Sequence, residues 1–429
     1  MPMPSSRPAV PAARRRTRVP PALTRGPEAM PALGIVDEVA GELGVVLWRC
    51  ARDVVLWAST PPARRSGLFT GTAAERRTRQ LEALSIDPEL AAPLAVMARV
   101  LESPAAIPER LLVNACRRLA LWAEQQGHLA TALEFTQAGA LVAPESAALA
   151  YAVGRLARRR AEYDRAESWY ARAIVQARRG GEHGVYARAY SGIGNLYYQR
   201  GNFPAAKRAY LRCLKASDRF GLDELRGSAY HDLFGVELET GAGPATEVFA
   251  ELALSAYGAN SRAVARLAFD VAYHWILRGR FSEALRVAQA LAPHFHAAAE
   301  RALVLSMIGR SAGGAGEAAT FRDVAGRLDE LLRSGVGEDS AARALLGLAF
   351  GAASLADWEV AESYAERAMD AGRDRREGKI VLAAEAALDS IRRRSAMARA
   401  QQAARRTLDL ADRFVSALEV QSGPPLAAV

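Results

Sequence analysis

A short turn-and-helix pattern recurs five times in the sequence and restricts the fold more than any other feature. The five copies read QGHLATAL, RAEYDRAE, RGNFPAAK, TGAGPATE and RGRFSEAL. Their equivalent turn positions, at intervals of 34, 40, 40 and 38 residues, are Gly127, Ala161, Gly201, Gly241 and Gly279. Self-similarity at a period of this length is typical of chains built from stacked helical pairs.

The residues around each turn indicate how the helices of a pair approach one another. In four copies a small residue lies seven positions before the turn: Ala120, Gly154, Gly194 and Ala272. In four copies an alanine lies five positions after it: Ala132, Ala166, Ala206 and Ala284. Packed helices approach to about 8–10 Å, and the closest crossings need small residues. We therefore expect Gly194 and Ala206 at one crossing. Three aromatic residues are expected to fill the space between that hairpin and the next: Tyr197, Phe203 and Tyr210.

One hairpin cannot cover its own apolar face, so the copies must stack. The pattern resembles the tetratricopeptide repeat over residues 109–375, with a sixth unit at LADWEVAESYAERAM and a degenerate one around GGAGEAATFRDV. The 40-residue spacing is similar to the longer repeats of bacterial transcriptional activators, peptide-sensing regulators and kinesin light chains. The resemblance implies an all-α fold, a right-handed α-solenoid of helical hairpins with N-terminal helices and a C-terminal capping helix.

Composition divides the chain into five segments. Residues 1–31 hold eight of the 20 prolines and are expected to form a disordered Arg/Pro-rich arm, with Met30 as an alternative start. An N-terminal helical region follows at 32–108, and the repeats occupy 109–375. Polar C-terminal capping helices are expected at 376–420 and a disordered tail at 421–429.

A helix predicted over residues 35–58 is apolar nearly all round, with Trp48 and Trp57 on opposite sides. Such a helix must be buried on both sides, either inside this fold or by self-association with a second chain. Its uncharged runs are too short to cross a bilayer, so we expect no membrane span. Two shorter helices are predicted at 72–84 and 88–102, the second with Asp87 as its N-cap.

The formal charge of +9 would favour a nucleic-acid partner if the basic residues were spread over the chain. Six arginines lie within the first 27 residues, which contain no acid, so the remaining residues carry only +3. Only three of the 56 basic residues are lysines, a bias that indicates GC-rich coding more than selection for phosphate contact. Nucleic-acid binding through the Arg-rich arm is therefore the least favoured function.

The sequence shows no pattern of catalytic or metal-binding chemistry. Cys50, Cys116 and Cys213 are far apart, and His294 and His296 would point away from each other on a helix. The resembling regulators usually join their repeats to a DNA-binding or nucleotide-binding domain, but the chain has no GxxxxGK[ST] motif. We predict a chain that is no enzyme and uses no cofactor and no metal.

The first helix of each hairpin should line a concave groove, which makes its outward residues the predicted partner-binding site. The predicted groove residues are Tyr151, Arg155, Arg158, Arg159, Arg188, Asn195, Tyr198, Gln199, His231, Arg266 and Tyr273. Arginine and tyrosine dominate this set, which favours a partner with an acidic segment. The resembling family binds C-terminal peptides with a carboxylate clamp, which is not expected here. Asn195 matches the asparagine of the clamp, but Ser191 replaces its basic residue and Asp232 replaces the asparagine of the next hairpin.

Together these patterns predict a cytoplasmic, bacterial, non-enzymatic adaptor or regulator that binds a partner protein or peptide in its groove. The alternative is a sensor of a signal peptide or small ligand that acts with an output domain on another chain.

Overall fold

The computed structural model describes residues 34–84, 87–241, 245–335, 337–394 and 405–421, and these residues form helices and turns without a β-strand. The chain divides into two compact units, unit 1 up to residue 225 and unit 2 from residue 226 onward. The predicted N-terminal arm, the alternative start at Met30 and all of the predicted tail except Gln421 lie outside the described residues.

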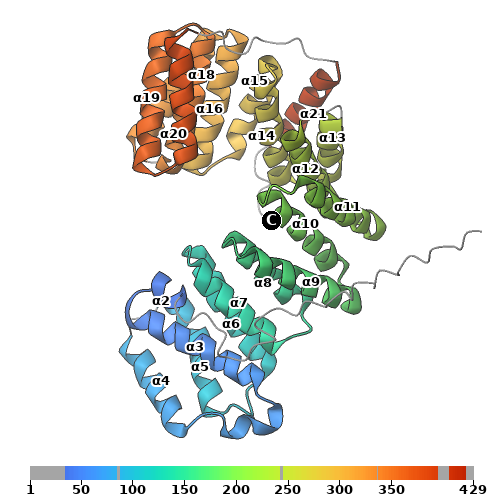
Figure 1. Cartoon of the computed structure of the whole chain (residues 1–429), viewed down its shortest axis with the longest axis vertical. Coiled ribbons are helices and arrows are strands. Elements are labelled where there is room, and N and C mark those ends of the chain that lie inside the picture. The colour runs from blue at the N-terminus through green and yellow to red at the C-terminus, as the bar shows by residue number, and fades with distance from the viewer. Residues whose placement is uncertain (1–33, 85–86, 242–244, 336, 395–404, 422–429) are drawn as a thin grey trace, which may run out of the picture. The chain divides into compact units, whose positions relative to one another are not determined.

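Unit 1 begins with helices that precede the repeats and continues with three helical hairpins (Figure 1). The first group is α2 (Gly34–Glu38), α3 (Gly41–Ser59), the 3-10 helix η2 (Pro62–Gly67), α4 (Gly71–Ala83) and α5 (Pro88–Glu102). The hairpins are α6 (Glu109–Gln125) with α7 (Leu129–Val142), α8 (Ala147–Arg159) with α9 (Tyr163–Gly180), and α10 (His183–Gln199) with α11 (Phe203–Phe220).

The aligned turn positions confirm the predicted register of the repeats. All five adopt a left-handed backbone conformation, with φ from 58° to 120°: Gly127, Ala161, Gly201, Gly241 and Gly279. The degenerate unit turns in the same way at Gly316, with φ of 82°, and the sixth unit at Ala356, with φ of 61°. Because one left-handed residue reverses the chain after a helix, the same turn serves every hairpin.

In two hairpins the small residue before the turn packs against an aromatic ring of the same hairpin. A Cβ atom on Gly194 would lie 2.3 Å from the ring of Tyr210, and one on Gly154 would lie 2.8 Å from the ring of Tyr170. Tyr210, which we expected between this hairpin and the next, thus contacts Gly194 of its own hairpin. Tyr170 also reaches the next hairpin, where a Cβ on Gly192 would lie 2.5 Å from its ring.

The predicted helix at 35–58 is divided into α2 and α3 by a break before Gly41. The carboxylate of Glu38, at the end of α2, accepts hydrogen bonds from the backbone N–H groups of Ala130 and Thr131 at 2.7 and 2.8 Å, which caps α7. α3 packs on α5 and α7, and Trp57 is fully buried while Trp48 is half-buried. Most apolar residues of α3 are therefore buried inside unit 1, whereas Trp48 stays partly exposed.

The other two helices predicted before the repeats are confirmed at α4 and α5. Asp87 is the N-cap of α5, as expected, and its side chain accepts a hydrogen bond from the Glu89 backbone N–H at 2.9 Å.

Unit 2 continues the hairpins and ends with two further helices. Its hairpins are α12 (Asp223–Thr240) with α13 (Ala245–Tyr257), α14 (Ser261–Leu277) with α15 (Phe281–Leu291), α16 (Ala298–Ala315) with α17 (Ala318–Arg333), and α18 (Glu338–Ser354) with α19 (Trp358–Asp374). The short 3-10 helix η3 (Ala292–His294) follows α15, and the last helices are α20 (Gly378–Arg392) and α21 (Arg405–Gln421).

Helices α16 and α18 meet through glycines on both helices. A Cβ atom on Gly313 would lie 2.2 Å from the backbone oxygen of Gly351, and one on Gly351 would lie 2.7 Å from that of Gly309. Backbone thus contacts backbone at this crossing, and no larger residue fits without moving a helix.

The two C-terminal helices, both expected to cap the array, pack in different places. α20 packs on α18 and α19, and Leu382 on its outer side is exposed. α21 packs instead on α13, α14 and α15 (Figure 1), where Phe414 and Leu418 are fully buried. A polar contact also holds α21 against α13, since the buried Thr407 hydroxyl lies 3.1 Å from the Glu247 carboxylate.

No helix in the described ranges has both the length and the hydrophobicity needed to cross a lipid bilayer.

Candidate functional site

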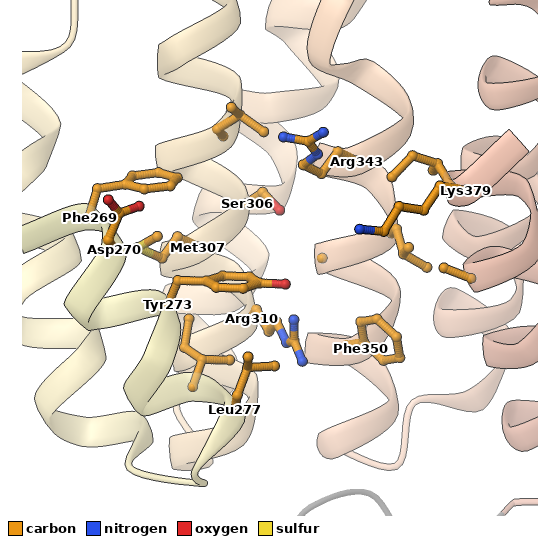
Figure 2. A pocket seen from close by; sticks show the side chains of 16 residues that line it. Phe269, Asp270, Tyr273, Leu277, Ser306, Met307, Arg310, Arg343, Phe350 and Lys379 are labelled. Atoms are coloured by element: carbon orange, nitrogen blue, oxygen red, sulfur yellow. The ribbon is translucent and has the colours of Figure 1, made fainter. Parts of the chain in front are cut away.

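A cavity of about 580 Å³ lies in unit 2 among the first helices of successive hairpins and α20. Its walls come from α14, α16, α18 and α20 (Figure 2). The lining residues are Phe269, Asp270, Tyr273, Ile276, Leu277, Leu303, Ser306, Met307, Arg310, Arg343, Leu346, Gly347, Phe350, Lys379, Ile380 and Ala383. A volume of this size is in the usual range for ligand sites.

The apolar wall of the cavity comes mainly from α14, because its residues recur at helical spacing. Phe269, Tyr273 and Leu277 are four residues apart, which places them on one side of the helix. Tyr273 is 47% exposed and Leu277 is 56% exposed, so both present ring or methyl carbons to the open space. Met307 and Leu346, both buried, complete an apolar floor.

Three cationic side chains enter the same cavity from three different helices: Arg310 from α16, Arg343 from α18 and Lys379 from α20 (Figure 2). Arg343 and Lys379 are exposed, whereas Arg310 is half-buried, with its guanidinium carbon 4.7 Å from the centre of the Phe350 ring. Burial lowers the pKa of Arg310, and the nearby Tyr273 hydroxyl opposes this effect. The charge of Arg310 is thus partly desolvated.

Carboxylates do not balance these cations in the part of the chain that the structure describes. No ion pair within 4.0 Å joins Arg310, Arg343 or Lys379 to a described acid. Asp270 is the one acidic residue among the described lining residues, and its carboxylate lies 2.8 Å from Nε2 of His231. The cavity therefore offers positive charge beside apolar surface, a combination suited to a carboxylate next to an aliphatic or aromatic group.

The cavity shows no arrangement suited to nucleophilic or metal chemistry. The Ser306 hydroxyl is engaged, because it donates to the Ala344 carbonyl oxygen at 2.8 Å. Among the described residues, no cluster of three or more histidine, cysteine, aspartate or glutamate side chains is arranged to hold a metal ion.

Four predicted groove residues lie on α8 in unit 1, where part of their charge is already used. Arg155 reaches both carboxylate oxygens of Glu124 on α6 at 2.6 Å, and Arg159 reaches one of them at 2.5 Å. The Arg155 hydrogen bonds are the largest cause of the lowered pKa of Glu124. Arg158 lies beside the hydroxyl of Tyr170, and Tyr151 is half-buried.

The predicted residues on α10 divide into structural and exposed ones. Asn195 accepts a hydrogen bond from the Tyr210 hydroxyl at 2.8 Å, and the Tyr198 ring packs against Phe203 at 5.5 Å. Arg188 and Gln199 are exposed.

In unit 2, Tyr273 lines the 580 Å³ cavity and His231 contacts it through Asp270. The exposed Arg266 lines a neighbouring cavity of about 290 Å³ that shares Phe269 and Asp270.

Sequence reasoning missed Arg310, Arg343, Phe350 and Lys379. A signal existed for two of them, because the residue six positions before the left-handed turn faces a cavity in several hairpins. That position is Leu121, Arg155, Tyr273, Arg310 and Phe350 in the hairpins that turn at Gly127, Ala161, Gly279, Gly316 and Ala356. Aligning the degenerate unit on its turn at Gly316 would have placed Arg310 at this position.

Residues 145–219, which cover α8, α9, α10 and nearly all of α11, match the family model of the tetratricopeptide repeat. This segment of the chain therefore carries tetratricopeptide (TPR) repeats. A search of curated proteins with the sequence of the TPR protein finds no match.

Two solved structures are similar to the TPR protein at low sequence identity. BtubC (BKLC) from P. vanneervenii is 16% identical with a TM-score of 0.41, over 53% of this chain and 92% of that one. A Rap protein complexed with competence and sporulation factor is 11% identical with a TM-score of 0.43, over 87% of this chain and 99% of that one.

Proposed function

We propose that the TPR protein is a non-enzymatic adaptor or regulator that holds a segment of a partner protein in the α14–α20 cavity. The observation that carries this proposal is the set of three cations, Arg310, Arg343 and Lys379, that line one largely apolar cavity without a paired carboxylate among the described residues. The favoured segment carries an aspartate or glutamate beside a large apolar side chain.

Electrostatics supports the acidic part of this segment. Bringing like charges together is unfavourable, and a carboxylate in the cavity would relieve the repulsion among the three cations. Arg310 would contribute most, because a partly desolvated guanidinium pairs more strongly with a carboxylate than an exposed one does. Tyr273 and Phe350 supply aromatic surface beside the charges, and such residues often dominate binding energy.

The size of the cavity favours a short segment, which makes a free signal peptide the second candidate ligand. The predicted groove residues on α8 and α10 (the α8–α10 set) stay part of the proposal as a further contact surface. They are Tyr151, Arg155, Arg158, Arg159, Arg188, Asn195, Tyr198 and Gln199. Pairing with Glu124 reduces what Arg155 and Arg159 offer a partner. Action in the bacterial cytoplasm, expected from the sequence, also belongs to this proposal, and the three buried cysteines without a disulfide agree with it.

Selection of peptides from a random library on the full chain tests the proposal. We expect enriched sequences to place aspartate or glutamate next to leucine, phenylalanine or tyrosine. A labelled consensus peptide should bind the Arg343→Ala, Lys379→Ala double variant at least tenfold more weakly, about 1.4 kcal/mol. The control is Arg367→Ala, since this exposed arginine of α19 pairs with Asp329 away from the cavity.

Binding of the same peptide also shows which of the two surfaces, the α14–α20 cavity or the α8–α10 set, contacts the ligand. A combined Arg155→Ala, Arg159→Ala, Tyr198→Ala variant should bind it less tightly only if the α8–α10 set also contacts the ligand. Enriched peptides without acidic residues, or full affinity in the Arg343→Ala, Lys379→Ala variant, would show that the α14–α20 cavity is not the binding site.

A further inference from the structure

A second charged cavity lies before the repeats, in the N-terminal helices of unit 1. It has a volume of about 540 Å³ and is formed by α3, α4 and α5 with the turn before α4. Its lining residues are Trp48, Arg49, Arg52, Asp53, Leu56, Phe69, Ala73, Arg76, Arg77, Arg79, Gln80 and Leu101. Five of these twelve residues are arginines, so positive charge is the main chemical property of the cavity.

One arginine has a structural role and uses the only carboxylate among the lining residues. The Arg77 guanidinium donates to the Asp53 carboxylate at 2.9 Å and to Cys50 Sγ at 3.0 Å. Arg77 and Asp53 are both about 95% buried, at 5% and 4% exposed. Because a buried charge must be paired, this ion pair fixes α4 against α3 and neutralises Asp53.

The other four arginines keep most of their charge available. Arg49 and Arg76 have no carboxylate within 4.0 Å in the described ranges. Arg52 lies 3.9 Å from Asp53, which Arg77 already holds, and Arg79 forms only an exposed pair with Glu75 at 3.7 Å. Exposed pairs of this kind contribute little, so four guanidinium groups face one cavity with almost no internal compensation.

We infer that the α3–α5 cavity binds a small molecule that carries two or more phosphate groups. A terminal phosphate carries close to two negative charges, an internal phosphate carries one, and each has several acceptor oxygens, which matches four guanidiniums better than single carboxylates do. The bounded volume favours a small molecule over an extended chain. Trp48 and Phe69, both half-buried in the wall, offer aromatic surface to a planar ring such as a nucleobase.

This inference is independent of the proposed adaptor function. The α3–α5 cavity lies before the first hairpin, and none of its residues lines the α14–α20 cavity. A phosphorylated ligand in the α3–α5 cavity would thus occupy a second site, separate from the site proposed for the partner segment.

Isothermal titration of the full chain with inorganic tripolyphosphate, ATP and citrate tests the inference. We expect tripolyphosphate and ATP to bind at one site per chain, and citrate, a tricarboxylate anion, to bind at least tenfold more weakly. The Arg49→Gln, Arg76→Gln double variant should lose at least tenfold in affinity for both phosphate ligands. Each single variant should lose at least threefold, with an unchanged far-ultraviolet circular dichroism spectrum.

Two matched controls locate the effect. Arg64→Gln removes an exposed arginine of η2 that does not line the cavity and should leave binding unchanged. The Arg343→Ala, Lys379→Ala variant should also bind tripolyphosphate normally, even if it has lost the partner peptide. The inference is overturned if neither phosphate ligand binds, if citrate binds equally well, if Arg64→Gln has the same effect as the double variant, or if only a single-stranded oligonucleotide binds.

Discussion

At the scale of single residues, the most informative feature is where the charged side chains find partners. The sequence shows many arginines and tyrosines on the first helices, yet it could not show which of them are already paired. Arg155 and Glu124 are 31 residues apart on different hairpins, so their contact depends on how the hairpins stack. Arg310 carries a similar charge without such a partner among the described residues, and this difference decides which site is favoured.

A buried histidine gives the fold a predicted dependence on pH. Burial, together with the nearby Arg278 and Arg280, lowers the pKa of His274 to about 4, against the opposing charge of Glu247. The unfolded chain binds a proton near pH 6.5, whereas the folded chain does not until about pH 4. The unfolded state therefore holds more protons in this window, and stability should fall as the pH is lowered through it.

Urea unfolding of the full chain at pH 7.5 and pH 5 measures this effect. We expect a smaller free energy of unfolding at pH 5, and a smaller difference between the two pH values in His274→Gln, which cannot bind the proton. Identical pH dependence in the two proteins would show that His274 does not contribute.

At the scale of helices, the spacing of residues predicted the hairpins but not the position of α21, which depends on packing between distant segments. The turn at Ala161 was found because its neighbours match those of the glycine turns. The return of α21 was missed because its contacts, such as Arg406 with Glu251 at 2.6 Å, join segments 155 residues apart. Local sequence carries no signal for a contact of that range. The amphipathic pattern of α21 fits a helix that caps the array as well as it fits a helix that packs on α13–α15.

The crossing of α16 and α18 should tolerate no added carbon. Gly313→Ala would place a Cβ 2.2 Å from the backbone of Gly351, so we expect a loss of about 1–3 kcal/mol in the free energy of unfolding. The matched control is Gly326→Ala, on α17, where no atom lies within 4 Å of an added Cβ. That change should stabilise the chain by up to about 1 kcal/mol through helix propensity. Thermal unfolding that does not distinguish the two variants would contradict this account of the crossing.

At the scale of the molecule, the two units are completed in different ways. Unit 1 buries α3 against α5 and α7, which follow it within the same unit. Unit 2 leaves α20 as the last helix of its stack and uses α21 to cover α13, α14 and α15. The stability of unit 2 should thus depend on α21.

Ending the chain after Arg394 tests this dependence. The truncation removes the buried Leu410, Phe414 and Leu418 and exposes the α13–α15 surface that they cover. We expect cleavage by a nonspecific protease to begin within residues 245–291, while residues 34–225 stay protected as in the full chain. Equal protection of both regions in the truncated and full-length proteins would contradict a structural role for α21.

The return of α21 also affects the order in which the chain can fold. A solenoid whose repeats contact only their neighbours can form step by step as it is synthesised. Contacts between α21 and α13–α15 span more than a hundred residues, and closing such long loops slows folding. During translation, unit 1 can complete its core early, whereas α13, α14 and α15 must wait until α21 has been synthesised. The nascent chain would therefore expose the α13–α15 surface on the ribosome, where a chaperone could protect it from aggregation.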